Sequence, residues 1–279
     1  MVSKLIKYDF QSFIRLILPV QLIVIGIAAL NRIVQLFEPA SIGVDASEAS
    51  RNAHAVYNTF FVSSMVLYGI AIATALILTV IVAIVRFYQG MYTNEGYLNH
   101  TLPVTPAQHI FAKLLNSLIF FVGTLFAIFL SFMVITLGEV NIEIFKAFGF
   151  LVGKFFSSAG AEGVLYIVEA GLLALISLIT MYLKLYFCIS VGQLAKKRKI
   201  LLAFGAFFGI YVAKQIIGTI FIAMVAVGVN WIYAIGEWFE NYASAVHFVL
   251  WFGIVIYAIA SVVYFALTRF IMGKKLNLT

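Results

Sequence analysis

Charged residues are the scarcest class in this chain: Asp, Glu, Lys and Arg make up only 10% of its 279 residues. A soluble protein carries about a quarter of its residues as charges. Apolar residues instead make up 64% of the chain, and its mean hydropathy is +1.09. Such a chain has too few charges to cover a water-facing surface. The composition therefore excludes the ordinary soluble class and predicts an integral membrane protein.

Cysteine and the motifs of enzyme active sites are also missing or nearly so. The only cysteine, Cys188, lies in an apolar run and has no second cysteine to pair with. The four histidines are scattered singly, and the chain contains no H-E-x-x-H, G-x-S-x-G or G-x-x-x-x-G-K-[ST] motif. We therefore expect no catalytic residues, no metal and no ATP site in this chain. A membrane enzyme is the weakest of three readings of its function.

Long apolar runs replace the missing charges. A helix that rises 1.5 Å per residue needs about 20 apolar residues to cross a hydrocarbon core of about 30 Å. Six segments meet this requirement: residues 13–30, 56–86, 110–137, 163–190, 200–227 and 243–270. We expect residues 1–279 to form a single all-α transmembrane domain. Residues 1–15 place apolar side chains near one helix face and basic ones elsewhere, which predicts an amphipathic elbow helix on the inner membrane surface.

The remaining charges fall unevenly on the two sides of these spans. One side holds 13 basic residues and two acids: Lys4, Lys7, Arg15, Arg86, Lys113, Lys184, Lys196, Lys197, Arg198, Lys199, Arg269, Lys274, Lys275, Asp9 and Glu95. The other holds four basic residues and eight acids: Arg32, Arg51, Lys146, Lys154, Glu38, Asp45, Glu48, Glu139, Glu143, Glu162, Glu237 and Glu240. Because basic residues concentrate on the cytoplasmic side, we expect a multi-pass protein of the plasma membrane with both termini in the cytoplasm. The asymmetry and the anionic inner leaflet explain the net charge of +7, which gives no reason to expect nucleic acid as a partner.

A polar stretch, T-N-E-G-Y-L-N-H-T-L-P-V-T-P-A-Q at residues 93–108, separates the second and third spans on the expected cytoplasmic side. Thr105, Pro106 and Gln108 have the spacing of a capping box, which predicts that the helix of the third span begins there. Upstream, Gly96 and Pro103 leave room only for a short helical piece around 95–100. Residues 91–105 therefore either contain a short helix that is held between two spans and moves with them, or form a plain polar loop.

Residues 86–105, R-F-Y-Q-G-M-Y-T-N-E-G-Y-L-N-H-T-L-P-V-T, resemble the first cytoplasmic loop of ABC-2-type transporter permeases of Gram-positive bacteria, where E-G-Y-L-x-x-T-L-P-V-[ST] recurs. I-S-V-G-Q-L-A-K-K-R-K at 189–199 and K-K-L-N-L at 274–278 are similar to later parts of that family. The resemblance implies that the first loop carries a coupling helix that docks on a separate ATPase through Tyr92, Glu95, Gly96, Tyr97, Leu98, Thr101, Leu102 and Pro103. It implies a second contact through Gln193, Lys196, Lys197 and Arg198.

The resemblance also implies a function. The chain would be the permease subunit of an ABC transporter, an exporter, paired in the lipid bilayer with a second permease that is identical or homologous. ATP and Mg would bind on a cytoplasmic ATPase partner, with no cofactor in this chain. The alternative is an ATPase-coupled membrane sensor or resistance subunit that detects antimicrobial peptides without bulk transport. Stimulation of the ATPase by a peptide that does not accumulate in vesicles would favour the sensor.

Three charges lie inside the predicted spans. Lys184 is close enough to the inner end of its span for its ammonium to reach the interface. Lys214 lies 15 residues past Lys199, about 22 Å along a helix, where a charge must face protein or water. Glu169 lies on the neighbouring span. Glu169 and Lys214 are therefore candidates for a translocation pathway or a dimer seam, and a purely structural pairing or a lysine that reaches the interface is the alternative.

Overall fold

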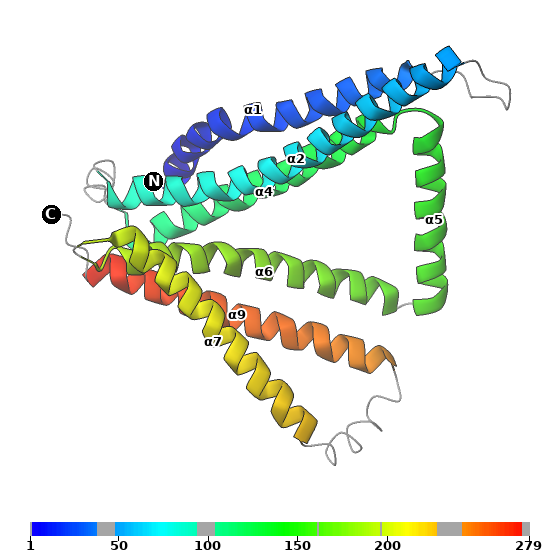
Figure 1. Ribbon diagram of the computed structural model, residues 1–279. Coiled ribbons are helices and arrows are strands. Elements are labelled where there is room, and N and C mark those ends of the chain that lie inside the picture. Colours follow the sequence, from blue (N-terminus) through cyan, green and yellow to red (C-terminus); the bar gives the residue numbers. More distant parts are fainter. Residues whose placement is uncertain are drawn as a thin grey trace. The chain divides into compact units, whose positions relative to one another are not determined.

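The structure is a computed structural model that describes residues 2–37, 48–93, 104–160, 162–195, 197–227 and 242–274. The described part contains seven α-helices and no β-strand (Figure 1). The helices are α1 (Val2–Leu36), α2 (Glu48–Tyr92), α4 (Pro106–Ile135), α5 (Glu139–Ala159), α6 (Glu162–Gly192), α7 (Lys199–Val227) and α9 (Tyr242–Lys274). The predicted all-helical fold is confirmed for these residues.

Six of the helices are long and apolar enough to cross a membrane, namely α1, α2, α4, α6, α7 and α9. Their most apolar windows have mean hydropathies between 1.9 and 2.7. The number of spans agrees with the prediction and indicates a multi-pass membrane protein. Several helices are longer than the predicted spans, and the 45 residues of α2 rise about 67 Å, roughly twice the thickness of a hydrocarbon core.

The predicted elbow segment and the predicted first span belong to one helix. α1 runs from Val2 to Leu36 with Pro19 inside it. A proline within a helix removes one backbone hydrogen bond and favours a bend. In Figure 1 the first turns of α1 curve away from the line of its remainder. The position of residues 1–15 on a membrane surface stays a prediction.

The described helices divide between two compact units, and each unit is described by itself. Unit 1 comprises Met1–Val2, Phe87–Leu114 and Val152–Thr279, and unit 2 comprises Ser3–Arg86 and Leu115–Leu151. α2 and α4 each contribute one end to unit 1 and most of their length to unit 2.

Unit 2 has an apolar core between α1, α2 and α4. Val24 and Ala28 of α1 pack with Tyr68 and Ala75 of α2 and with Ile135 of α4. Two of these five residues are alanines, and small side chains let helix backbones approach closely. Close approach is needed in a bilayer because lipid tails are as apolar as the core and give no hydrophobic driving force for helix association.

Polar side chains also join the three helices of unit 2. Nε2 of Gln21 on α1 donates to Oγ1 of Thr124 on α4 at 3.1 Å, and the Thr124 hydroxyl lies 2.9 Å from that of Thr79 on α2. The hydroxyls of Tyr68 on α2 and Ser131 on α4 lie 2.8 Å apart. In a membrane such bonds contribute about 0.6 to 2 kcal/mol each. They therefore fix which faces of the three helices meet.

Unit 1 is built on the parallel pair α6 and α9. Oγ1 of Thr180 on α6 donates to the carbonyl of Tyr257 on α9 at 2.9 Å, and Glu169 on α6 contacts His247 on α9. The partners are 77 residues apart in the first contact and 78 in the second. A nearly constant separation means that the two helices run in the same direction. The segment that connects α6 to α9 in the sequence, which contains α7, therefore has to run back in the opposite direction.

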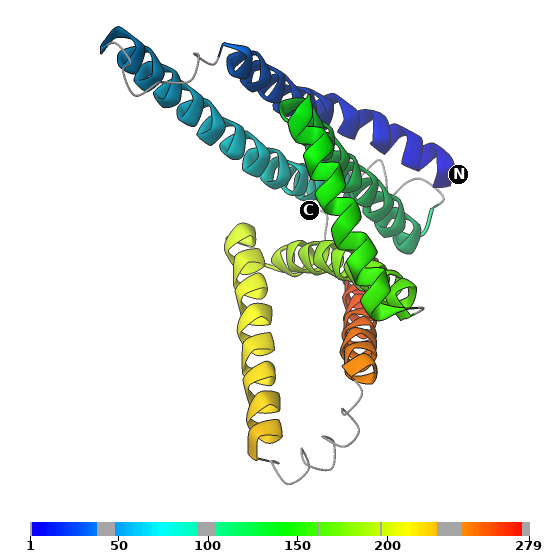
Figure 2. The same cartoon turned by 90° about the vertical axis from the view of Figure 1, so that its right-hand side faces the viewer.

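α7 is the least covered of the six candidate spans. None of the residues in its most apolar window is buried. In Figure 1 and Figure 2, α7 meets α6 at one end and diverges from α6 and α9 toward the other. The contacts of α7 with α6 and α9 therefore lie in its first half, from Lys199 to Lys214.

Candidate functional site

The end of α2 and the end of α6 are bound together in unit 1. The hydroxyl of Tyr92 lies 2.7 Å from that of Ser190, and the ring of Phe87 stacks on that of Tyr186 with centroids 4.0 Å apart. The Tyr186 hydroxyl donates to the carbonyl of Lys113 on α4 at 3.3 Å. We call these five residues the loop-end cluster. The cluster brings to one place the end of α2, the beginning of α4 and the end of α6.

Of the predicted residues of the first loop, Tyr92 is described by the structure. The others, Glu95, Gly96, Tyr97, Leu98, Thr101, Leu102 and Pro103, lie outside the described residues, as does the predicted coupling helix. The hydroxyl of Tyr92 bonds within the chain, and the residue is half-buried. Its contact with a partner protein stays a prediction.

The start of α4 follows the predicted capping pattern. α4 begins at Pro106, and the backbone N–H of Thr105 donates to Oε1 of Gln108 at 2.9 Å. This bond is the one that the glutamine of a capping box makes. The prediction that the helix begins here is confirmed. The polar stretch therefore ends at a fixed point of unit 1.

The second predicted loop forms the turn between α6 and α7. Gln193, Lys197 and Arg198 lie in this turn, whereas Lys196 lies outside the described residues. The N–H of Gln193 donates to the carbonyl of Ile189 and is also 3.2 Å from that of Ser190, which closes the end of α6. The turn therefore starts next to the loop-end cluster, and its basic residues are exposed.

Two backbone features make the turn tight. Arg198 has a φ of 62°, a left-handed conformation that is uncommon for a residue with a side chain. Gly192 is buried, and a Cβ there would lie 2.7 Å from both Cβ of Ala203 and the carbonyl oxygen of Lys199. Glycine at 192 therefore allows α7 to begin directly against the end of α6.

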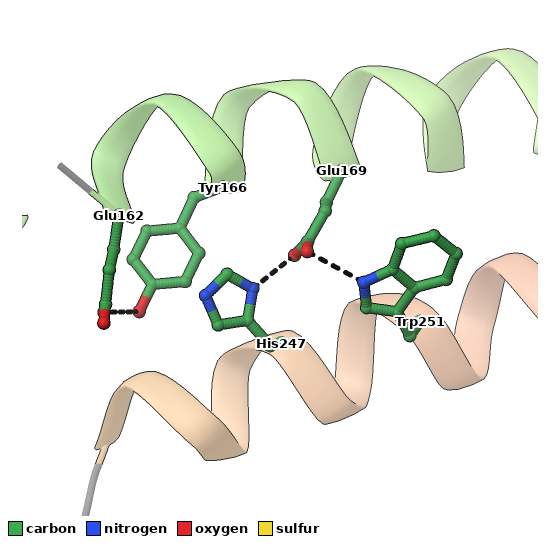
Figure 3. A network of polar contacts seen from close by, with 5 residues as sticks. All are labelled: Glu162, Tyr166, Glu169, His247 and Trp251. Carbon is green, nitrogen blue, oxygen red and sulfur yellow. Dashed lines mark hydrogen bonds and ion pairs between the residues drawn. The ribbon is translucent and has the colours of Figure 1, made fainter.

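Glu169, one of the two predicted pathway candidates, is buried between α6 and α9 (Figure 3). Its Oε2 lies 2.7 Å from Nδ1 of His247, and Nε1 of Trp251 donates to its Oε1 at 2.8 Å. Beside this pair, the Tyr166 ring lies 4.6 Å from the His247 ring, and the Tyr166 hydroxyl donates to Glu162 at 3.2 Å. Both carboxyl oxygens of Glu169 are therefore occupied by α9.

Lys214, the other candidate, is not brought to Glu169. Its Nζ lies 5.5 Å from the ring centroid of Tyr257 on α9, and the residue is exposed. Lys184 on α6 has a similar aromatic neighbour, since its Nζ lies 4.7 Å from the ring centroid of Phe207 on α7. These distances are typical of cation–π contacts. Lys184 and Lys214 therefore each have an aromatic neighbour on another helix. Glu169 belongs to a separate network with His247 and Trp251.

The loop-end cluster and the Glu169 network were both missed by sequence reasoning. A signal existed for each, because Tyr186 and Ser190, like His247 and Trp251, are four residues apart and share a helix face. Nothing in the spacing says which other helix that face meets. Among the described residues, no group of three His, Cys, Asp or Glu side chains is close enough to hold a metal ion.

No protein-family model, no curated protein and no solved structure matches this chain. The six candidate spans, the loop-end cluster, the Glu169 network and the aromatic contacts of Lys184 and Lys214 are therefore the basis for assigning a function.

Proposed function

We propose that this chain is the permease subunit of an ABC transporter of the ABC-2 type, an exporter that couples ATP hydrolysis on a separate ATPase to movement of a substrate across the plasma membrane. It works as one of a pair of permeases, with both termini in the cytoplasm. ATP and Mg bind to the partner, and no cofactor binds here. In this proposal residues 1–15 are an amphipathic elbow helix, and residues 91–105 hold the coupling helix.

The observation that carries the proposal is the contact between Tyr92 and Ser190. The resemblance in residues 86–105 and 189–199 assigns ATPase contacts to two loops that are far apart in the sequence. A single docking partner requires that both loops start from the same place. The loop-end cluster supports this, since it joins the helix ends from which the two loops leave.

The tight connection of α6 to α7 supports a mechanical coupling. Because Gly192 allows α7 to begin directly against the end of α6, a force applied to the basic turn would be transmitted directly to α7. The same force would reach α2 through the loop-end cluster. The ATPases would therefore move α2, α6 and α7 together when they close on ATP.

The test is co-purification from the native host in mild detergent through a C-terminal tag. The unmodified chain should bring down a soluble P-loop ATPase in stoichiometric amount. Changing Glu95, Tyr97 and Leu98 together to Ala should abolish the recovery of the ATPase, because the anchors of the coupling helix are gone.

The matched control changes one acid and two large apolar residues of α5, all exposed: Glu143, Phe145 and Phe148 to Ala. This control should retain the ATPase. A chain that purifies alone, or an ATPase that stays bound to the first variant, contradicts the proposal.

A further inference from the structure

Two lysines of unit 1 lie at membrane depth on neighbouring helices. Lys184 is eight residues before Gly192 on α6, and Lys214 is fifteen residues past Lys199 on α7. At 1.5 Å per residue the two positions are about 12 Å and about 22 Å from the turn that joins the helices. The Nζ of Lys184 lies 4.7 Å from the ring centroid of Phe207, which is seven residues, about 10 Å, before Lys214 on the same helix, so the two lysines lie on the facing parts of α6 and α7.

The described part of unit 1 supplies no acid to neutralise these lysines. Its only acids are Glu162 and Glu169, near the opposite end of α6. Glu169 is about 22 Å from Lys184 along the helix and is already bonded to His247 and Trp251. Two unneutralised cations in a low-dielectric medium favour the binding of an anion between them.

The surroundings of the lysines indicate what kind of anion can reach them. Phe204, Phe208, Tyr211 and Ile217 of α7 are each more than 60% exposed, so the outer surface of this helix is apolar over the depth of both lysines. Figure 2 shows α7 standing clear of α6 and α9 beyond the turn. A ligand that comes from the bilayer therefore meets an apolar surface beside a pair of positive charges.

Basic residues also lead toward this position from the turn. Lys197, Arg198 and Lys199 are exposed at the junction of α6 and α7. Together with Lys184 and Lys214 they place positive charge at three successive depths. An anionic group that leaves the inner leaflet thus finds a cation at each step of about 10 Å.

We propose that Lys184 and Lys214 bind the phosphate headgroup of an anionic phospholipid whose acyl chains lie along the exposed face of α7. The inference deepens the proposed function by naming an anionic lipid as its substrate class, and it rests on that function for the direction of transport. A free phosphate ion has the same headgroup chemistry. The apolar approach to the site favours the lipid.

The experiment measures lipid binding to the full chain, purified without the ATPase, stripped of lipid and analysed by native mass spectrometry. Phosphatidylglycerol is titrated against the protein, and phosphatidylcholine of the same acyl chains serves as the zwitterionic reference. The double variant Lys184→Ala/Lys214→Ala should bind phosphatidylglycerol at least about tenfold more weakly, which corresponds to about 1.4 kcal/mol. Binding of phosphatidylcholine should not change.

The control is Lys146→Ala/Lys154→Ala, which removes the same charge from two exposed lysines of α5 and should bind like the unmodified chain. Lys184→Arg/Lys214→Arg, which keeps the charge, should also retain binding. If the alanine variant does not fold, Lys184→Gln/Lys214→Gln gives the same comparison with an uncharged polar side chain in place of each lysine.

Three results would overturn the inference. Equal binding of phosphatidylglycerol by the lysine variant and the α5 control would show that the lysines do not hold the lipid. Displacement of the lipid by inorganic phosphate at millimolar concentration would indicate a soluble anion. Disulfide dimers of Gly205→Cys in membranes, with lipid binding unaffected by the lysine changes, would show that a second copy covers α7. In each case recovery of the ATPase by the unmodified chain would leave the permease proposal standing.

Discussion

At the scale of single residues, the environment of Glu169 shows what charge in a membrane requires. The sequence offered Lys214 as a partner because both charges lie on adjacent spans. The structure gives the carboxyl group two N–H partners on α9 instead, at 2.7 and 2.8 Å. Neutral or weakly basic donors satisfy a buried carboxyl group without a second full charge to desolvate, which a buried lysine would add. Glu169 therefore links α6 to α9 through these two contacts.

Replacing Glu169 by Ala should destabilise the protein by about 1 to 2 kcal/mol, because the two hydrogen bonds that join α6 to His247 and Trp251 of α9 are lost. The thermal unfolding midpoint in detergent, followed by size-exclusion recovery after heating, measures the change. Glu162→Ala removes the same charge from an exposed position one helical turn from Tyr166 and should have little effect. Equal midpoints for the two variants would mean that the network does not hold the helices together.

At the scale of helices, the sequence predicts the number of long apolar helices better than where each helix ends. The predicted spans 163–190 and 200–227 agree closely with α6 and α7, because a glycine and a run of basic residues separate them. The predicted spans 13–30 and 56–86 are much shorter than α1 and α2. Hydropathy marks only the part of a helix that lies in hydrocarbon. A helix without a breaker continues into water, where its backbone bonds are still internal.

The turn between α6 and α7 is a feature that hydropathy cannot locate to a residue. Gly192→Ala should destabilise the protein by about 1 to 3 kcal/mol, since the added methyl group would lie 2.7 Å from two atoms at the start of α7. Gly205→Ala in the middle of α7 is the control, because nothing lies within 4 Å of a Cβ there. The thermal midpoint and the recovery of the ATPase should both fall for Gly192→Ala and stay unchanged for Gly205→Ala. A fall of similar size in both variants would contradict the close approach.

The candidate site was predictable only in part, and the limit is physical. The capping box at Thr105 and Gln108 involves residues three apart, so its spacing alone specifies the contact. The bond of Tyr92 to Ser190 joins residues 98 apart. Periodicity tells which face of a helix a residue occupies, but the rotation of one helix against another depends on packing along the whole pair. Contacts between distant helices therefore needed the structure.

At the scale of the whole molecule, the number of candidate spans and the distribution of charges together predict how the chain is oriented in the membrane. Six crossings return the chain to its starting side. The parallel register of α6 and α9 requires α7 to cross between them, which agrees with this count. The excess of basic residues on one side then predicts that this side faces the cytoplasm.

Cysteine labelling in intact cells tests the orientation. The sole cysteine is buried, so Cys188→Ala gives a background without thiols. In that background Asn52→Cys, exposed near the start of α2, should react with a membrane-impermeant maleimide in intact cells. Ser3→Cys, exposed at the start of α1, should react only after the cells are made permeable. The reverse pattern would place both termini outside.

The parallel pairing of α6 and α9 also has a consequence for synthesis. Glu169 lies 78 residues before His247 and 82 before Trp251, so it leaves the ribosome well before its partners exist. At about 5 to 20 residues per second this delay is roughly 4 to 16 s. During that time a carboxyl group enters the bilayer without its donors. α9 thus supplies the partners of a residue on the earlier helix α6, and a nascent chain that stops before residue 247 would leave Glu169 without them.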